Sequence, residues 1–201
     1  MIITIARQCG CGAVHVGKIL SRRLGLVLYT RQMLKDMAGN QGLGDEMDYF
    51  FDERPVDNIL MAISDYNEAQ EEIKHRFSTL FNKIIGTQDC IVIGRCGNSI
   101  FSGRNDLVSV FLKGDRTTRI MNTAAEEGIS TSDARRCVEE TDEHRMMYHK
   151  YYTGLTWGNA NDYDLCIDSL RLGAEMTADL IMAYAQNTVG HRKNTHRGVQ
   201  E

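Results

Sequence analysis

Two glycines, Gly10 and Gly12, lie in a short loop between a β-branched apolar run and a segment with helical periodicity. Because glycine has no side chain, backbone N–H groups in such a loop can approach an anion closely. The N-terminus of the following helix adds unpaired N–H donors and the positive end of the helix dipole. The spacing therefore favours a phosphate-binding loop, although a tight turn without a ligand gives the same pattern.

Arginines follow two further apolar runs: Arg31 after the second run, and the pair Gly94 and Arg95 after the third. The planar guanidinium group donates two parallel hydrogen bonds and suits phosphate. The carboxyl ends of parallel strands meet at one edge of a sheet, where ligands bind in open α/β folds. A single surface arginine is usually only solvated, so the repeated position at strand ends is what predicts an anion site.

These positions require a parallel sheet, and five short apolar runs supply candidate strands. The runs are continuous rather than alternating, and helical patterns separate them, which is typical of parallel strands covered on both faces. We predict an α/β fold with a five-stranded parallel sheet flanked by helices. The predicted strands cover residues 2–6, 26–29, 90–94, 107–112 and 164–168.

Apolar periodicity and end signals predict the helices. These helices cover residues 13–24, 55–86, 115–127, 132–151 and about 171–186, with Gly25, Gly86 and Gly128 as stops, Asp115 as an N-cap, and Ser130 with Asp133 in capping-box spacing. The helix over 55–86 favours an inserted element that covers the substrate, and a plain long crossover is the alternative. Residues 187–201 lack apolar periodicity and are predicted to form a disordered tail.

The composition is that of an ordinary globular protein, with 201 residues of which 42% are hydrophobic and 25% charged. It predicts one domain. The net charge of −4 argues against a broad basic field for nucleic acid, so an anion site must be local. No apolar run approaches the roughly 18 residues of a membrane span, and no signal peptide is recognisable. We expect a cytoplasmic protein that binds neither nucleic acid nor a membrane.

Six cysteines are dispersed along the chain, and we expect them to be reduced. Cys9, Cys11 and His15 have a spacing that suggests metal ligands, but a metal site needs about four ligands and no second pair is present. The number of candidate ligands therefore favours ordinary thiols in a loop over a metal site. The 10 methionines are compatible with a homodimer interface and equally with ordinary core filling.

Several segments match those of a known family: ITIARQCGCG, VGKILSRRLGL, LYTRQML, CIVIGRCGNSIF, DLVSVFLKGDRTTRI and the run TDEHR…YYTGLTWG…YDLCIDS. On these segments the chain resembles the cytidylate kinase-like family of P-loop nucleoside monophosphate kinases over nearly all of residues 2–185. The resemblance implies a three-layer P-loop kinase fold in a single domain over 1–186, with a helical monophosphate-binding insert at about 38–86 and a lid at about 114–150. It also implies phosphoryl transfer from ATP, with Mg²⁺, to a nucleoside monophosphate such as CMP or dCMP.

The resemblance assigns roles to individual positions. The phosphate-binding loop falls on Arg7, Gly10, Cys11, Gly12, Ala13, Val14 and His15. The acceptor nucleotide falls on Arg31, Gly94 and Arg95. The arginines of the lid and of the helix after it, which reach the transferring phosphoryl group, fall on Arg119, Arg135 and Arg145.

The loop departs from the Walker A pattern, G-x-x-x-x-G-K-[ST], in which the lysine binds the β- and γ-phosphates and the hydroxyl binds Mg²⁺. Aligned through the following helix, Ala13 takes the place of the lysine and Val14 that of the hydroxyl residue. The arginine common in loops of this branch is also missing, and Cys96 replaces the aspartate that usually follows Gly-Arg. Arg7, His15 when protonated, and the lid arginines are candidate substitutes.

Phosphate binding needs only backbone N–H groups, whereas efficient transfer depends on well-placed charge. Three hypotheses stay open: an ATP-dependent nucleoside monophosphate kinase, a nucleotide- or phosphometabolite-binding module that has lost catalysis, and a kinase for a different small phosphate acceptor. Trp157 suggests either base stacking or a packing anchor. Asp168 either contacts an adenine-side loop or N-caps the last helix.

Overall fold

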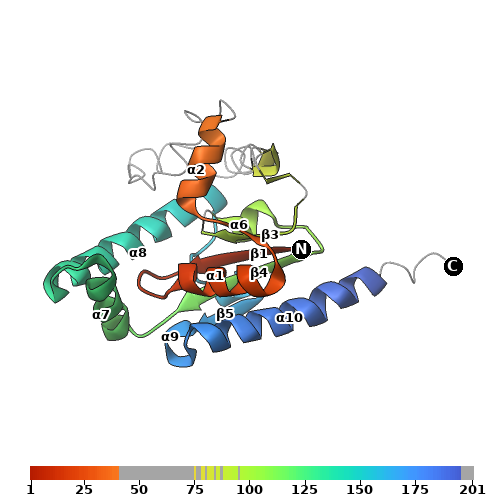
Figure 1. The fold of residues 1–201 in the computed structure, drawn as a ribbon. Coiled ribbons are helices and arrows are strands. Elements are labelled where there is room, and N and C mark those ends of the chain that lie inside the picture. Colours follow the sequence, from red (N-terminus) through yellow and green to blue (C-terminus); the bar gives the residue numbers. More distant parts are fainter. Residues whose placement is uncertain are drawn as a thin grey trace.

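A five-stranded parallel sheet forms the centre of the molecule, with strands in the order β2-β3-β1-β4-β5 (Figure 1). The computed structural model describes residues 1–40, 75, 78–79, 81–83, 85–86, 88–94 and 96–195, with the backbone alone from 189 to 195. The strands are β1 Ile2–Arg7, β2 Val27–Tyr29, β3 Cys90–Ile93, β4 Leu107–Lys113 and β5 Leu165–Asp168. The predicted fold class is confirmed, and each strand ends within one residue of its expected bounds.

Helices follow the strands and cover both faces of the sheet. They are α1 Ala13–Leu24, α2 Arg31–Asn40, α6 Gly97–Ile100, α7 Arg116–Glu127, α8 Thr131–Thr153, α9 Ser169–Leu172 and α10 Ala174–Thr195, with a 3₁₀ turn at Ala160–Asp162. The N-caps are where the sequence predicts them: the Asp115 carboxylate accepts from the Thr118 N–H, and the Ser130 hydroxyl accepts from the Asp133 N–H. Gly25 and Gly128 end their helices in the left-handed conformation that glycine favours.

The C-terminal helix differs from its prediction. A break at Gly173 separates α9 from α10, and α10 continues to Thr195 rather than stopping near 186. An established helix adds one backbone hydrogen bond for each further residue, so it needs no apolar partner to propagate. Residues 187–195 are therefore helical, and the prediction of a disordered tail is wrong for them. Residues 196–201 lie outside the described part of the chain.

Two other expectations concern the segment between β2 and β3. The long helix predicted over 55–86 and the insert predicted over about 38–86 fall mostly on residues outside the described ranges. Apolar periodicity does not predict α2 or α6: α2 buries only Leu34 and Ala38, and α6 has four residues.

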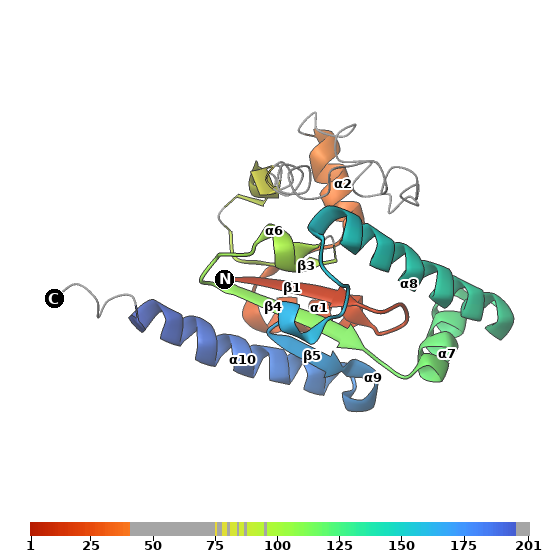
Figure 2. The same ribbon diagram turned by 180° about the vertical axis from the view of Figure 1, so that it is seen from behind.

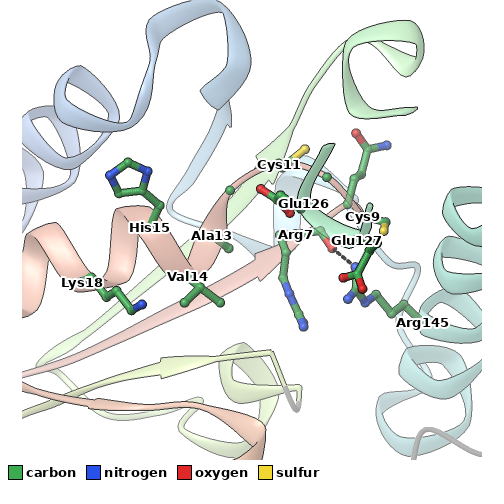
Figure 3. A pocket seen from close by; sticks show the side chains of 13 residues that line it. Arg7, Cys9, Cys11, Ala13, Val14, His15, Lys18, Glu126, Glu127 and Arg145 are labelled. Carbon is green, nitrogen blue, oxygen red and sulfur yellow. Dashed lines mark hydrogen bonds between the residues drawn. The ribbon is translucent and has the colours of Figure 1, made fainter. Parts of the chain in front are cut away.

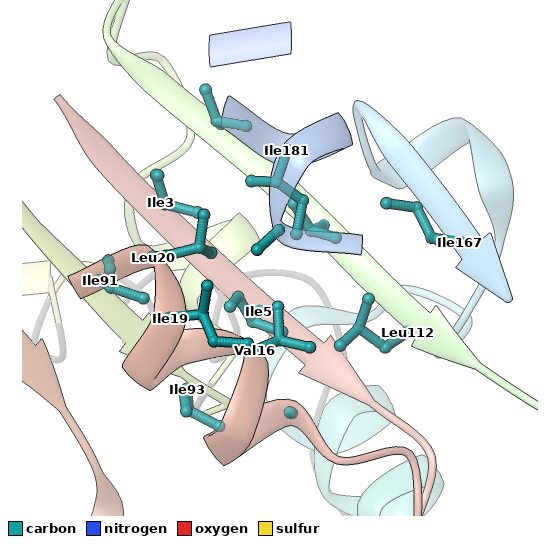
Figure 4. Close-up of a cluster of buried hydrophobic side chains, with 14 of the residues drawn as sticks. Ile3, Ile5, Val16, Ile19, Leu20, Ile91, Ile93, Leu112, Ile167 and Ile181 are labelled. Atoms are coloured by element: carbon teal, nitrogen blue, oxygen red, sulfur yellow. The ribbon is translucent and has the colours of Figure 1, made fainter. Parts of the chain in front are cut away.

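Two hydrophobic clusters hold the layers together, one on each face of the sheet. The first lies between the strands and the helices α1 and α10, and includes Ile3, Ile5, Val16, Ile19, Leu20 and Ile181 (Figure 4). The second joins the other face to α2, α6 and α8 through Leu34, Ile100, Tyr148 and Tyr152. A Cβ placed on Gly17 would lie 2.9 Å from a methyl of Leu28, so α1 packs unusually close to the sheet. This packing fixes the start of α1 against the end of β1.

Among the described helices, none is long and apolar enough to cross a membrane. All six cysteines are free thiols.

Candidate functional site

The loop between β1 and α1 has the backbone geometry of an anion cradle. Gly10 and Gly12 have φ angles of +77° and +66°, in the left-handed region that side chains disfavour. A Cβ on Gly10 would also collide with the carbonyl oxygen of Arg119. Within the described part of the chain, no residue accepts a hydrogen bond from the backbone N–H groups of residues 10–15. These are the donors that an anion at a helix N-terminus uses.

The carbonyl groups of the same loop are held from outside. The Asn122 amide donates to the Gly10 carbonyl at 3.2 Å, and the Ser169 hydroxyl donates to the Cys11 carbonyl at 2.9 Å. With its carbonyls held by the protein, the loop keeps its shape and leaves its N–H groups for a ligand. Figure 2 shows α7 and α8 beside this loop.

A cavity of about 580 Å³ opens over the loop (Figure 3). It is lined by Arg7, Gln8, Cys9, Gly10, Cys11, Gly12, Ala13, Val14, His15, Lys18, Glu126, Glu127 and Arg145. Every residue that the resemblance assigns to the phosphate-binding loop is on this wall, and Arg145 is the one predicted lid arginine that reaches it.

Arg7 and Arg145 also line a second, much smaller cavity, of about 20 Å³, at the end of β3. The Arg7 guanidinium lies directly over Gly94, whose missing side chain makes room for it. Arg145 reaches across from α8, and its guanidinium donates to the Arg7 carbonyl at 3.4 Å. Arg7 and Arg145 thus line both the large and the small cavity.

The small cavity is lined by Ala6, Arg7, Gly94, Cys96, Asn98, Arg145, Tyr148, His149 and Trp157. Two of its buried polar side chains have an atom without a partner among the described residues, Nε2 of His149 and Oδ1 of Asn98. The amide of Asn98 donates to the Asp162 carbonyl at 3.4 Å, which turns its oxygen away from that contact. Burial lowers the pKa of His149 to about 4, against a smaller opposite effect of Asp162, so the imidazole is neutral at pH 7.

Arg119 occupies a different place from the one expected for a lid arginine. It is buried, forms an ion pair with Asp142 of α8, and donates to the carbonyls of Gly114 and Cys9 at 3.2 and 3.3 Å. Asp142 in turn accepts the Cys9 N–H at 2.7 Å. Arg119 lines neither the large nor the small cavity. It therefore connects α7 and α8 to the loop.

The remaining predicted residues are not brought to the cavities. Arg135 is exposed on α8, and Arg31 is exposed at the start of α2, and neither lines the two cavities. Arg95 lies outside the described residues.

The structure also bears on side chains whose roles the sequence left open: Asp168, Trp157, and the thiols of Cys9 and Cys11. The Asp168 carboxylate accepts from the Arg171 N–H at 3.1 Å, so Asp168 is an N-cap, of the short α9 rather than of the last helix α10. Trp157 packs edge-on against Phe111, with ring centroids 5.3 Å apart, and it also contributes to the wall of the small cavity. Burial raises the pKa of Cys9, and raises that of Cys11 to about 11, so both loop thiols stay protonated at pH 7.

Sequence reasoning missed several residues that line the cavities: Lys18, Glu126, Glu127, Asn98 and His149. Lys18 had a detectable signal, since it follows Val14 by one helical turn. Glu126 and Glu127 of α7 had no signal in the sequence, because the position of their carboxylates depends on how α7 packs beside the loop.

Comparison with known proteins agrees with this geometry. The cytidylate kinase-like family matches residues 2–171. A cytidylate kinase of Methanopyrus kandleri is 24% identical over 193 residues, which cover 91% of this chain and 92% of the relative. An uncharacterized protein from Eubacterium ventriosum has a crystal structure that matches with a TM-score of 0.71 at 25% identity, covering 93% of this chain and 98% of that one.

The fold also matches shikimate kinase from Bacteroides thetaiotaomicron, with a TM-score of 0.50 at 9% identity, over 92% of this chain and 98% of that one. This likeness concerns the fold alone. With a family match over most of its length, the chain belongs to the cytidylate kinase-like family and has a P-loop kinase fold.

Proposed function

We propose that this protein transfers a phosphoryl group from ATP to a nucleoside monophosphate, with CMP or dCMP as the acceptor. The observation that carries the proposal is the position of Arg7 and Arg145, which line both the large and the small cavity. Phosphoryl transfer depends on positioning two substrates in line and on stabilising the charge of the group between them. Two arginines that line both cavities suit that requirement.

The large cavity is the proposed site of the ATP phosphates. Its N–H groups at residues 10–15 bind phosphate oxygens without any side chain. Arg119 holds the loop in shape through Asp142 and the Cys9 carbonyl, so we assign it a positioning role. The proposed roles of Arg31, Arg95 and Arg135 rest on the family resemblance alone.

The small cavity, of about 20 Å³, has room for about one water molecule, so the proposal is that its polar atoms face one edge of the acceptor base rather than enclose the ring. Asn98 Oδ1 accepts a hydrogen bond, and the neutral His149 donates one when its ring proton is on Nε2. Cytosine presents an amino donor next to a ring acceptor, which complements this pair, whereas uracil presents the reverse order. Adenine has the same order as cytosine, so AMP is the informative comparison. The cytidylate kinase of M. kandleri supports the choice of CMP.

Mg²⁺ supplies charge neutralisation at the phosphates in kinases of this fold. Val14 offers no hydroxyl at the usual position, but Glu126 and Glu127 bring two carboxylates to the large cavity. Because Mg²⁺ can be bound by a single carboxylate together with substrate phosphates, and adjacent helix residues do not face each other, one of these two carboxylates would be the ligand of the ion.

A second candidate function is a nucleotide- or phosphometabolite-binding module that has lost catalysis. Ala13 and Val14 carry no ammonium or hydroxyl, and Arg119 is occupied by Asp142. These observations favour retained binding with weakened transfer, since removal of one well-placed donor typically costs about 10²–10³-fold in rate.

A coupled assay distinguishes the two functions. ATP and Mg²⁺ are offered with CMP, dCMP, UMP, AMP and GMP, and isothermal titration measures the binding of ATP and CMP separately. The kinase proposal expects turnover, with CMP or dCMP preferred. Nucleotide binding without turnover of any monophosphate would instead establish the binding module, or direct the search to a different phosphate acceptor.

A further inference from the structure

Lys18 lies on the wall of the large cavity, although no sequence motif assigns it a role. It follows Val14 by four residues on α1, so the two side chains share one face of the helix. Ala13 and Val14 are the positions at which the loop lacks an ammonium and a hydroxyl. The nearest lysine along the chain is therefore one helical turn beyond the loop.

The direction of the side chain favours a contact with the loop. Long side chains in a helix point back toward its N-terminus. Figure 3 shows the Lys18 side chain extending along α1 toward Val14. The N-terminus of α1 is also where the unpaired N–H groups of the loop are found.

No protein group in the described part of the chain competes for this ammonium. Lys18 is exposed and has neither an ion pair nor a hydrogen bond with any described residue. Arg23, on the same helix, is paired with Glu175 and Asp179. Arg119 is paired with Asp142. Lys18 is thus a cation on the cavity wall that no carboxylate of the described chain neutralises.

The charge balance of the cavity depends on this residue. Arg7, Lys18 and Arg145 contribute three positive charges, and Glu126 and Glu127 contribute two negative charges. Without Lys18 the formal charges of these side chains would sum to zero, so the backbone N–H groups of the loop would have no net side-chain charge to assist them in binding a polyphosphate.

We infer that Lys18 binds the terminal phosphates of the nucleotide in the large cavity and supplies the ammonium that the loop itself lacks. The inference rests on the proposed function for the presence of a nucleotide there. It adds a phosphate-binding residue that comes from the second turn of the helix rather than from the loop.

The test compares Lys18→Met, Lys18→Arg and Arg22→Met. Arg22 is exposed in the last turn of α1 and does not line the cavity, so its variant removes one positive charge from the same helix without touching the site. Isothermal titration with ATP, ADP and AMP, each with Mg²⁺, gives the affinities, and the coupled assay gives kcat and KM.

We expect Lys18→Met to weaken ATP binding at least tenfold and AMP binding less than twofold, because only the longer polyphosphate reaches the ammonium. Its kcat falls about a hundredfold, Lys18→Arg recovers most of both losses, and Arg22→Met stays within twofold of the wild type. Equal ATP affinities and equal kcat for Lys18→Met and Arg22→Met would overturn the inference.

Failure of the proposed function gives a different result. If the wild type binds ATP but transfers no phosphate, the kinase proposal fails, and the ATP affinities of the three variants still decide the role of Lys18. If the wild type binds no nucleotide at all, both proposals fail. Far-UV circular dichroism and thermal melts verify that the variants are folded, which the exposure of Lys18 and Arg22 favours.

Discussion

Arg7 and Arg145 are 138 positions apart in the sequence, and the fold brings them together on the walls of the same two cavities. The backbone of Gly94 leaves the space into which the Arg7 side chain fits, and the length of α8 brings Arg145 to the end of β1. A guanidinium group in such a position can stabilise the charge of a group in transit between two substrates.

Replacement of Arg145 tests this placement. We expect Arg145→Met to lower kcat by roughly 10²–10³-fold, because a charged donor at the transferring group is lost. Arg136→Met is the matched control, since Arg136 is exposed on the same helix and, among the described residues, its ion pair is with Asp133 three residues away. Steady-state kinetics measures both variants, and similar kcat values for the two would contradict the assignment.

The buried His149 makes a prediction about pH. Its pKa in the folded protein is about 4, below its ordinary value of 6.5, so the unfolded chain takes up a proton at a higher pH than the folded one. The His149 contribution to stability is therefore complete above about pH 6.5 and is lost as the pH falls toward 4, by about 3 kcal/mol.

We expect His149→Gln to flatten the decrease of the unfolding free energy between pH 7 and pH 4.5. Urea denaturation of the wild type and of the His149→Gln variant at several pH values measures the unfolding free energy. A wild-type slope that persists in the variant would show that other groups cause the acid sensitivity.

The glycine loop and the cysteine thiols could be predicted from the sequence because their signals are local. Gly10 and Gly12 are close in sequence to the helix that they precede, and capping signals such as Ser130 act over three residues. The partner of Arg119 could not be predicted, since Asp142 is 23 residues away and the contact depends on how α7 and α8 pack.

At the scale of elements, Arg119 and Asp142 join three parts of the site. Arg119 belongs to α7, Asp142 to α8, and both bond to Cys9 of the loop. The side chains of Arg119 and Asp142 are 8% and 18% exposed. Removal of one member of such a pair leaves the other charge poorly solvated, which is more costly than replacement of both.

We expect Arg119→Met to lower the unfolding free energy by about 3–5 kcal/mol. The double variant Arg119→Met with Asp142→Asn should regain part of this loss, because the asparagine keeps an oxygen for the Cys9 N–H without the uncompensated charge. Urea unfolding of the wild type, the two single variants and the double variant measures the coupling. Strictly additive losses would show that the two side chains do not stabilise each other.

The boundaries of α1, α7 and α8 follow from caps and glycines in the sequence, whereas α10 shows where this reasoning fails. Residues 187–195 offer no apolar stripe, yet no proline interrupts them and the preceding turns are fixed against the sheet. Periodicity detects which face a helix buries, and it does not detect a helical segment whose sequence has no apolar stripe.

At the scale of the whole molecule, the sequence predicts a parallel sheet but not the order of its strands. Continuous apolar strands predict parallel pairing, and the order β2-β3-β1-β4-β5 comes from how the crossover helices pack. The placement of β1 at the centre, between β3 and β4, puts the glycine loop beside the end of each neighbour. The two cavities form there.

A ligand that binds only the folded protein must stabilise the whole molecule. At a concentration of ATP about a hundred times its Kd, we expect a gain of about 2.7 kcal/mol, which raises Tm by roughly 5–10 °C for a chain of this size. Differential scanning fluorimetry with ATP, and with adenosine as the control that lacks phosphates, measures it. Equal shifts for the two ligands would argue against a phosphate site.

The ion pair between Arg119 and Asp142 also bears on the thermodynamics of substrate capture. The helices α7 and α8 are anchored to the loop by contacts within the protein itself, so little ordering of this region is left for the nucleotide to bring about. Such preorganisation lowers the entropic cost of association. We therefore expect that this region adds little to the heat-capacity change of nucleotide binding, whereas a region that folds on binding would add a large one. Calorimetric titrations at several temperatures measure this heat-capacity change.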